Sequence, residues 1–126
     1  MFRLSAKSKE NLRGVHPKLC EVVNYAIMIS DVDFAVIEGV RSIERQKQLV
    51  EAGASRTMKS RHLTGHAVDL AAIVGNEIRW DWPLYPKIAD AMKKAALSLD
   101  VKITWGGDWV SLKDGPHFEL NSKEYP

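Results

Sequence analysis

The chain has 126 residues and a formal net charge of +2, with 45% hydrophobic and 27% charged residues. These values are typical of one folded domain, which we expect to span 1–126. The small net charge gives no electrostatic footprint of nucleic-acid binding, and the absence of an apolar run of about 18 residues excludes a transmembrane helix. The charged opening stretch MFRLSAKSKENLRG lacks the apolar segment of a signal peptide. We therefore expect no membrane insertion and a protein made in the cytoplasm.

The first half of the chain predicts a helix, a strand and a second helix. In the stretch HPKLCEVVNYAIMIS, apolar side chains recur at helical spacing. Residues 34–40 are short and rich in β-branched and aromatic side chains, which favours a strand that delivers Arg41 at its end. Ser42 is a suitable N-cap for a helix over 43–53, with Gly53 as its stop.

The second half predicts more strands and one further helix. A polar loop over 54–66 runs into the strand AVDLAAIV, and Gly75 with Asn76 suggests a hairpin into EIRW. The strongest helical periodicity begins at Pro86, and it is followed by the alternating VKITW and the short strand HFEL. The strands are too closely spaced for successive βαβ crossovers. The pattern therefore predicts an α+β fold, with a small antiparallel sheet packed with about three helices.

Three side chains are candidate metal ligands: His62, Asp69 and His117. Because neighbouring residues of a strand point to opposite faces, Asp69 and His117 lie on the polar faces of strands that are otherwise apolar. If both strands belong to one sheet, they can project these ligands from the same face, and His62 on the preceding loop can complete the set. Two imidazoles and one carboxylate leave a tetrahedral position for water, which is the arrangement of catalytic rather than structural zinc.

His66 is a competing ligand, because His62 and His66 have the i, i+4 spacing of helical zinc motifs. Thr64 and Gly65 speak against a helix here, and the glutamate expected after the first histidine is missing. A turn that enters a buried strand explains the same stretch without a metal. The residues favour His62 over His66.

Residues for the chemistry can also be named. Asp114 lies three positions before His117, and the Gly-Pro turn between them can bring its carboxylate to the metal. There it could act as general base and acid. An aspartate in an Asp-Gly turn is by itself usually structural. Arg41 could stabilise the oxyanion of the attacked carbonyl, or it could form a surface salt bridge. Glu119 is interpreted as a partner that orients a ligand histidine.

Several motifs resemble those of the M15 metallopeptidases. SRHLTGHAVDL fits the S-x-H-x-x-G-x-A-x-D signature, and DGPHFEL is similar to the second motif, an acidic residue three positions before the last zinc ligand. GVRS resembles the segment that carries the substrate arginine, and WGGDW is similar to a stretch in phage and prophage members. The resemblance covers about residues 5–120. It implies the α+β fold that D-Ala-D-Ala peptidases share with the Hedgehog signalling domain.

The resemblance also implies roles for individual residues. Zinc would be held by His62, Asp69 and His117, with Asp114 as general base and acid, Arg41 as oxyanion stabiliser and substrate-binding residue, and Ser60 in a hydrogen bond to substrate or a ligand. The position of His66 is not a ligand in this family. Many members have glutamate in place of Asp114, and aspartate is the choice of the phage-type members.

The function that the resemblance implies is that of a phage endolysin, a monomeric zinc peptidase that hydrolyses the L-alanyl-D-glutamate bond of peptidoglycan stem peptides. Such a protein accumulates in the host cytoplasm and acts on the cell wall and periplasm after release through a holin. One alternative is a D-Ala-D-Ala carboxypeptidase or dipeptidase, against which the missing export signal argues. Another is a zinc-containing binding module without activity, against which the presence of Asp114 argues.

A basic cluster, formed by Arg56, Lys59 and Arg61, flanks the first motif. Its simplest interpretation is a solvated loop. Because stem peptides carry carboxylates, the cluster could instead attract and orient an anionic substrate at the cleft.

Overall fold

The structure is a computed structural model, and it describes residues 1–55 and 57–126. The α-helices are α1 (Ala6–Asn11), α2 (Pro17–Ile29), α3 (Ile43–Glu51) and α4 (Tyr85–Leu99). The strands are β1 (Asp33–Glu38), β2 (Ala67–Val74), β3 (Glu77–Arg79), β4 (Ile103–Trp105) and β5 (His117–Leu120). Short 3₁₀ turns are η1 (Arg61–Thr64), η2 (Trp82–Leu84) and η3 (Gly106–Asp108). None of the described helices is long and apolar enough to cross a membrane.

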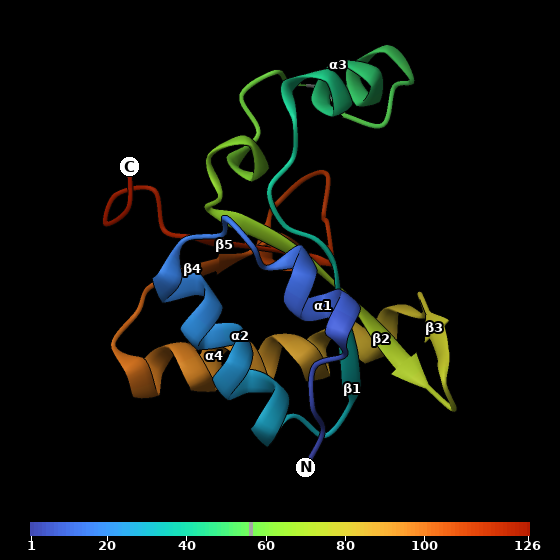
Figure 1. Ribbon diagram of the computed structural model, residues 1–126, viewed down its shortest axis with the longest axis vertical. Coiled ribbons are helices and arrows are strands. Elements are labelled where there is room, and N and C mark those ends of the chain that lie inside the picture. Colours follow the sequence, from blue (N-terminus) through green and yellow to red (C-terminus); the bar gives the residue numbers. More distant parts are fainter. Residues whose placement is uncertain (56) are drawn as a thin grey trace.

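The strands form an antiparallel sheet in the order β1-β2-β5-β4, and β3 pairs with the C-terminal part of β2 on the edge opposite β1. Helices α2 and α4 pack on each other along one face of this sheet, whereas α3 lies at the opposite end of the molecule (Figure 1). The core lies between these two helices and the sheet. Its fully buried members include Leu19, Val22, Ile88, Met92, Leu70 and Phe118. The predicted α+β class with a small antiparallel sheet is confirmed.

Local sequence signals account for the ends of several elements. The Ser42 side chain accepts a hydrogen bond from the Arg45 N–H and caps α3, as predicted. Gly53, with φ of 76°, follows this helix in the left-handed region that favours glycine. Gly75 and Asn76 also have positive φ, which suits the tight turn of the predicted hairpin between β2 and β3.

The structure differs from the sequence-based expectation in its N-terminal helix. About three helices were expected, but α1 is an additional α-helix in the described chain. It is six residues long and mostly polar, and it buries only Ser8, so it lacks the apolar periodicity that predicts a helix. The Ser5 side chain caps it by accepting a hydrogen bond from the Ser8 N–H.

Two predicted strands are shorter than expected. Strand β1 ends at Glu38, where the pairing register with β2 shifts, and β4 begins only at Ile103. The predicted polar loop over 54–66 is also not entirely irregular, because η1 lies within it. These ends depend on which neighbouring strand offers hydrogen bonds, so side-chain periodicity alone places them poorly.

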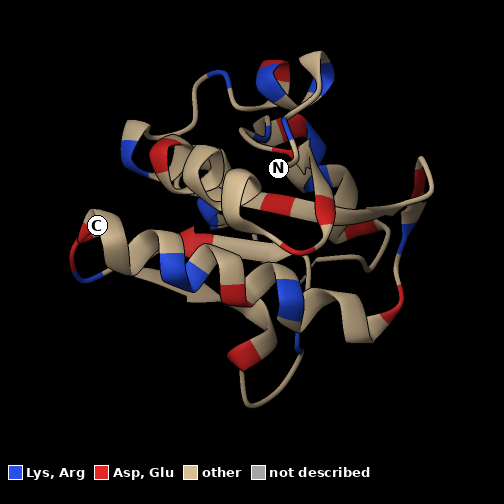
Figure 2. Cartoon of the chain, turned by 90° about the horizontal axis from the view of Figure 1, so that it is seen from below, with Lys and Arg blue, Asp and Glu red and all other residues tan. Residues whose placement is uncertain are grey.

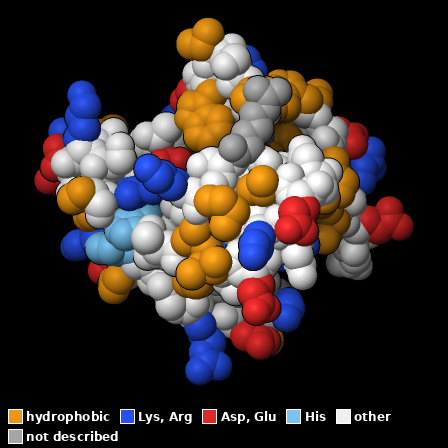
Figure 3. Space-filling model, turned by 90° about the horizontal axis from the view of Figure 1, so that it is seen from above, with side chains coloured by type: hydrophobic (Ala, Val, Ile, Leu, Met, Phe, Trp, Pro, Cys, Tyr) orange, Lys and Arg blue, Asp and Glu red, His pale blue; other side chains and the backbone are white. Residues whose placement is uncertain are grey.

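Charged side chains are spread over the surface without a single dominant sign. On the side seen from below, Lys and Arg alternate with Asp and Glu along the helices (Figure 2). From above, basic side chains stand out at several separate places rather than as one continuous patch (Figure 3). This distribution agrees with the small net charge.

Candidate metal centre and cleft

The pairing of β2 with β5 brings two of the predicted ligands together. Asp69 and His117 are direct partners in the antiparallel register, so their side chains leave the sheet on the same face. Their neighbours Val68 and Phe118 are also paired, and both are fully buried on the helical side of the sheet. The side-chain alternation predicted for both strands is therefore confirmed.

The third ligand comes from the turn that precedes β2. His62 lies in η1, where the Ser60 side chain accepts a hydrogen bond from the His62 N–H at 3.2 Å. Gly65 ends the turn with φ of 76°, and a Cβ there would lie 2.6 Å from the carbonyl oxygen of Gly14. Only glycine therefore fits at this close approach. The Nδ1 of His62 is 2.9 Å from the carbonyl oxygen of Gly39, which directs Nε2 toward Asp69.

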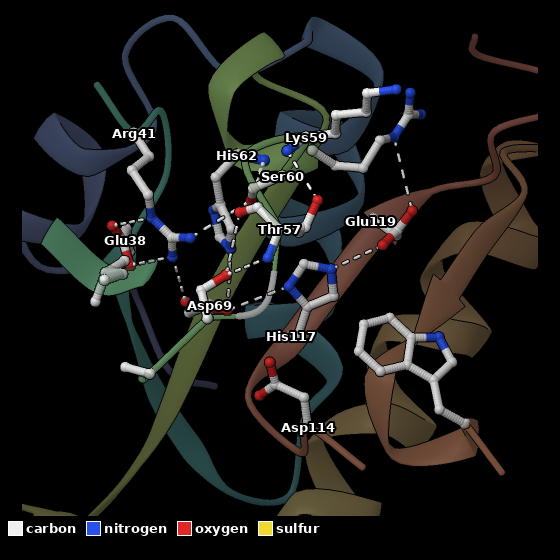
Figure 4. A pocket seen from close by; sticks show the side chains of 15 residues that line it. Glu38, Arg41, Thr57, Lys59, Ser60, His62, Asp69, Asp114, His117 and Glu119 are labelled. Atoms are coloured by element: carbon white, nitrogen blue, oxygen red, sulfur yellow. Dashed lines mark hydrogen bonds and ion pairs between the residues drawn. The ribbon is translucent and has the colours of Figure 1, made fainter. Parts of the chain in front are cut away.

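The three potential ligand atoms converge on one point (Figure 4). Oδ1 of Asp69 is 3.3 Å from Nε2 of His62 and 3.5 Å from Nδ1 of His117, and all three atoms lie within 4.8 Å of one another. This carboxylate oxygen is buried and has no hydrogen-bond partner among the described residues. A buried, unpartnered carboxylate oxygen beside two imidazole nitrogens fits a divalent cation. The three residues could therefore hold a metal ion.

The pKa values of these groups show that the site favours positive charge. Burial alone would raise the pKa of Asp69, but the close imidazoles of His117 and His62 outweigh burial and hold that pKa well below its usual range. Burial alone would lower the pKa of His117, yet Asp69 and Glu119 raise it to about 9. Without a metal, a proton on His117 supplies the positive charge that the ionised carboxylates stabilise.

Glu119 contacts the ligand histidine as predicted. The Nε2–H of His117 donates to Oε1 of Glu119 at 2.8 Å, which leaves Nδ1 to face Asp69. Such a contact orients the ring and selects the tautomer in which Nδ1 is free to bind a metal.

Arg41 lines the same cleft but is firmly held by the protein. Its guanidinium donates two hydrogen bonds of 2.7 Å to Glu38 and one of 2.8 Å to Gln46. Weaker contacts reach Ser60 at 3.4 Å and Asp69 at 3.7 Å. Arg41 does form a salt bridge, with Glu38, but its side chain is only 10% exposed, so the pair lines the cleft and does not lie on the open surface. The hydrogen bonds to Glu38 are the main cause that raises the pKa of Arg41, and its charge is permanent.

Sequence reasoning missed the partners of Arg41. Gln46 is fully buried although the rest of helix α3 is not, and its amide nitrogen donates to Ser55 at 2.9 Å and to the carbonyl of Thr57. Nothing in the local pattern distinguishes Gln46 from a solvated glutamine. The Glu38 carboxylate, three positions before Arg41, has the spacing of a local ion pair and could have been considered from the sequence.

Asp114 reaches the cleft from the turn before β5. Its N–H donates to the carbonyl of Gly106 at 3.1 Å, and its own carbonyl accepts from the His117 N–H at 3.2 Å. A Cβ at Gly106 would lie 2.3 Å from the Asp114 carbonyl, so a glycine is needed for this packing. The desolvation of its carboxyl group and the nearby charge of Asp69 raise the pKa of Asp114.

The cleft that these side chains line has a volume of about 400 Å³. His62, Asp69, His117, Arg41, Ser60 and Asp114 all border it. The structure thus brings together every residue that the sequence analysis proposed for the site. The arrangement provides a cation site, a carboxylate of raised pKa and a fixed guanidinium, which suits hydrolysis by a metal-activated water.

Of the two remaining sequence-based candidates, His66 lies outside the cleft and the basic cluster lies partly at it. His66 contacts the hydroxyl of Thr64 at 2.7 Å and packs beside His16, and it is not part of the convergent ligand group. Of the basic cluster, Arg56 lies outside the described residues, whereas Lys59 and Arg61 both line the cleft. Lys59 is exposed there, and the guanidinium of Arg61 turns toward the C-terminal segment.

The fold and the cleft are consistent with a metal-dependent hydrolase, and comparison with known proteins identifies the peptidase family. Residues 1–121 match the family model described as phage L-alanyl-D-glutamate peptidase, and the chain belongs to this peptidase family. It is 30% identical to the L-alanyl-D-glutamate peptidase of Escherichia phage T5, over 98% of this chain and 93% of that protein. It is 28% identical to the peptidoglycan L-alanyl-D-glutamate endopeptidase CwlK of Bacillus subtilis, over 71% of this chain and 61% of CwlK.

Solved structures agree. The crystal structure of the L-Ala D-Glu endopeptidase ChiX of Serratia marcescens superposes with a TM-score of 0.95 and 50% sequence identity, covering 99% of this chain and 94% of ChiX. The D,D-dipeptidase VanXYg superposes with a TM-score of 0.55 at 21% identity, covering 84% of this chain and 50% of that chain. The second likeness shows a shared fold and no more.

Proposed function

We propose that this chain is a zinc-dependent peptidase that cleaves the L-alanyl-D-glutamate bond in the stem peptides of peptidoglycan. The observation that carries the proposal is the convergence of His62, Asp69 and His117 on one point, in a cleft that Asp114 also borders. The family description and the printed activities of CwlK and ChiX support this choice of bond.

His62, Asp69 and His117 would hold the metal through Nε2, Oδ1 and Nδ1. Nitrogen and carboxylate ligands, with a single cysteine in the whole chain, favour zinc in a catalytic type of site. Zinc bound here would lower the pKa of a water molecule and polarise the carbonyl of the scissile bond.

Asp114 is the proposed general base and acid. Its raised pKa brings the carboxyl group closer to the range in which it can both accept and return a proton. It takes a proton from the attacking water and then delivers it to the nitrogen of the leaving D-glutamate. The hydrogen bond from the His117 N–H to the Asp114 carbonyl fixes the distance between the proposed base and a proposed metal ligand.

Arg41 is the proposed stabiliser of the oxyanion. Its short hydrogen bonds to Glu38 and Gln46 hold the guanidinium still, and the weak contacts to Ser60 and Asp69 are those that a substrate oxygen can replace. Ser60, whose hydroxyl caps η1, is placed to accept or donate a hydrogen bond at the same edge of the cleft.

The proposal extends to the setting in which the enzyme works. We propose that residues 1–126 act as one catalytic domain and as a monomer. We also propose that the protein accumulates in the host cytoplasm and reaches the wall after release through a holin, and its membership of a phage peptidase family is the reason for this proposal. The substrate itself is a peptide of the cell wall, so no nucleic-acid partner is needed.

Digestion of purified peptidoglycan, followed by mass spectrometry of the fragments, tests the proposed function. We expect new amino termini at D-glutamate, and we expect their loss in the presence of a chelator and their return on addition of Zn²⁺. Release of terminal D-alanine alone would instead establish the carboxypeptidase alternative. Binding of peptidoglycan without any cleavage would establish the binding module.

A further inference from the structure

Arg61 connects three segments that surround the metal centre. It lies in η1 next to the ligand His62, and its Nε is 3.6 Å from Oε2 of Glu119. Its Nη2 donates to the carbonyl of Leu120 at 3.2 Å and also to the carbonyl of Tyr125. The guanidinium of Arg61 therefore contacts strand β5 and the segment that follows it, and the next residue in the chain is the candidate ligand His62.

The contact with Glu119 matters because Glu119 holds His117. One carboxylate oxygen accepts from His117 and the other faces Arg61, so the two imidazole ligands are joined by the path His62, Arg61, Glu119 and His117. Strand pairing sets Asp69 against His117, but it does not place η1. Other contacts hold η1 toward residues 14–16 and 39–41, among them His62 Nδ1 to the Gly39 carbonyl and the Arg41 N–H to the His62 carbonyl. The contacts of Arg61 are those that join the turn to β5 and so bear on the separation of His62 and His117.

Electrostatics makes this path sensitive to Arg61. The Glu119 side chain is 16% exposed, and a largely buried carboxylate needs compensating charge. Arg61 and His117 supply it from opposite sides. The Nε of Arg61 is buried and has no hydrogen-bond partner among the described residues. Its ion pair is with Glu119.

The C-terminal segment provides the outer support of Arg61. The Asn121 N–H donates to the carbonyl of Lys102, and the Tyr125 N–H donates to the carbonyl of Asn121 at 2.8 Å. The Tyr125 ring packs edge-on against His16, with 5.4 Å between ring centroids. These contacts fix the Tyr125 carbonyl, which then orients the guanidinium.

We propose that Arg61 and Glu119 form a positioning pair for the metal centre, and that residues 121–126 anchor this pair. Arg61 touches no reacting atom and acts by keeping His62 and His117 at metal-binding separation. The inference rests on the metal site of the proposed function. It deepens that proposal by stating that Arg61 and the C-terminal segment increase the affinity of the site for metal.

The first experiment measures metal affinity directly. Zn²⁺ dissociation constants of the wild type, Arg61→Gln and Arg61→Lys are determined by competition with a chromophoric chelator. We expect Arg61→Gln to weaken binding by about 10- to 100-fold, the range typical of lost support behind a ligand. Arg61→Lys should recover part of this loss, because it keeps the charge toward Glu119 but not the forked contact to the carbonyls. Arg45→Gln, on an exposed position of α3, is the matched control.

A spectroscopic measurement separates positioning from general loss of structure. In the Co²⁺-substituted protein, the visible absorption bands report ligand geometry, and we expect them to shift in Arg61→Gln and remain as in the wild type in Arg45→Gln. Thermal unfolding in chelator checks that both variants fold. Wild-type affinity and spectrum in a folded Arg61→Gln would overturn the inference.

Removal of residues 122–126 tests the anchor separately. Without the Tyr125 carbonyl, Arg61 loses one acceptor, so we expect weaker Zn²⁺ binding in the same direction as Arg61→Gln, and no additional loss when the two changes are combined. Unchanged affinity in the shortened protein would overturn the anchoring role. Failure of the wild type to bind Zn²⁺ at all would instead contradict the proposed function.

Discussion

Asp69 is the residue on which both histidines of the metal centre converge. Its Oδ1 faces His62 and His117, while its Oδ2 lies 3.7 Å from Arg41. The carboxylate thus carries negative charge into a place that is surrounded by cationic groups, which explains its lowered pKa. Some side chains around it face the proposed metal position, and others, such as Glu119, contact the proposed ligands.

We predict that a substitution of Asp114 lowers catalysis without affecting folding. Asp114→Asn keeps the size of the side chain and the backbone contacts of the turn, but it removes the proton acceptor. Turnover of peptidoglycan should fall by about 10²-fold or more, with unchanged Zn²⁺ content and unfolding temperature. Near-normal turnover in this variant would transfer the role of base to another group, and Glu119 would be the next residue to test.

At His117 we predict opposite pH dependences for the metal-free and metal-loaded protein. The pKa of His117 in the folded, metal-free protein is raised from 6.5 to about 9, so protonation stabilises the fold. This contribution is complete below about pH 6.5 and is lost as pH rises through about 9, at most about 3 kcal/mol in free energy of unfolding. Thermal unfolding in chelator should therefore show decreasing stability over this range.

Metal binding should strengthen over the same range, because the ion must displace the proton from Nδ1 of His117. Apparent Zn²⁺ affinity, measured between about pH 6.5 and about pH 8.5, is expected to rise by up to about tenfold per pH unit. The variant His117→Ala is the control for the unfolding profile in chelator, since it lacks the titrating group. A flat affinity profile in the wild type would contradict the raised pKa.

Among the secondary-structure elements, η1 and β5 determine the site more than the long helices do. The turn η1 delivers His62 and β5 delivers His117, and both are short. Short elements have little stability of their own, so contacts with the rest of the chain must hold them. The close approach of Gly65, at the end of η1, to the backbone of Gly14 is one such contact.

We predict that Gly65→Ala disturbs this element and the metal site together. The new Cβ would lie 2.6 Å from the Gly14 carbonyl and would require a left-handed backbone, so η1 must shift. We expect a loss of about 1–3 kcal/mol in unfolding free energy, with weaker Zn²⁺ binding. Gly53→Ala is the matched control, since it has the same φ of 76° but nothing within 4 Å. Equal effects of the two changes would attribute the loss to backbone strain alone.

At the scale of the whole molecule, basic groups are scattered rather than gathered, and those in the cleft are mostly paired. Arg41 pairs with Glu38, and Arg61 pairs with Glu119. Lys59 is exposed at the rim of the cleft and has no carboxylate within ion-pair distance in the described parts of the chain. The steering role expected of the basic cluster therefore rests, among the described residues, on Lys59.

We predict that Lys59→Gln raises KM for peptidoglycan at low salt and leaves kcat and Zn²⁺ content unchanged. The charge acts on anionic stem peptides before they bind, so its effect should shrink as ionic strength rises from about 0.01 M to about 0.15 M, where the Debye length is about 8 Å. Lys47→Gln, on exposed α3, is the control. Equal KM values for wild type and Lys59→Gln at low salt would show that the loop is only solvated.

Much of the fold and the ligand set follows from the sequence alone. Strand β2 has the predicted bounds, because its apolar run is continuous and ends at turn-forming residues. Asp69 and His117 could be assigned to one face because a strand alternates its side chains strictly, and His62 could be assigned by ligand type and proximity in sequence. These inferences need only short-range geometry, which spacing along the chain encodes.

Only the tertiary structure decided which distant groups support the site. Glu38, Gln46 and Arg61 surround the ligands through contacts whose partners local periodicity does not reveal, and Arg61 reaches a carbonyl 64 positions away in the chain. The polar helix α1 likewise became evident only in three dimensions. The physical reason is that apolar spacing specifies which face of an element is buried, whereas the pairing of buried polar groups depends on how the completed elements pack.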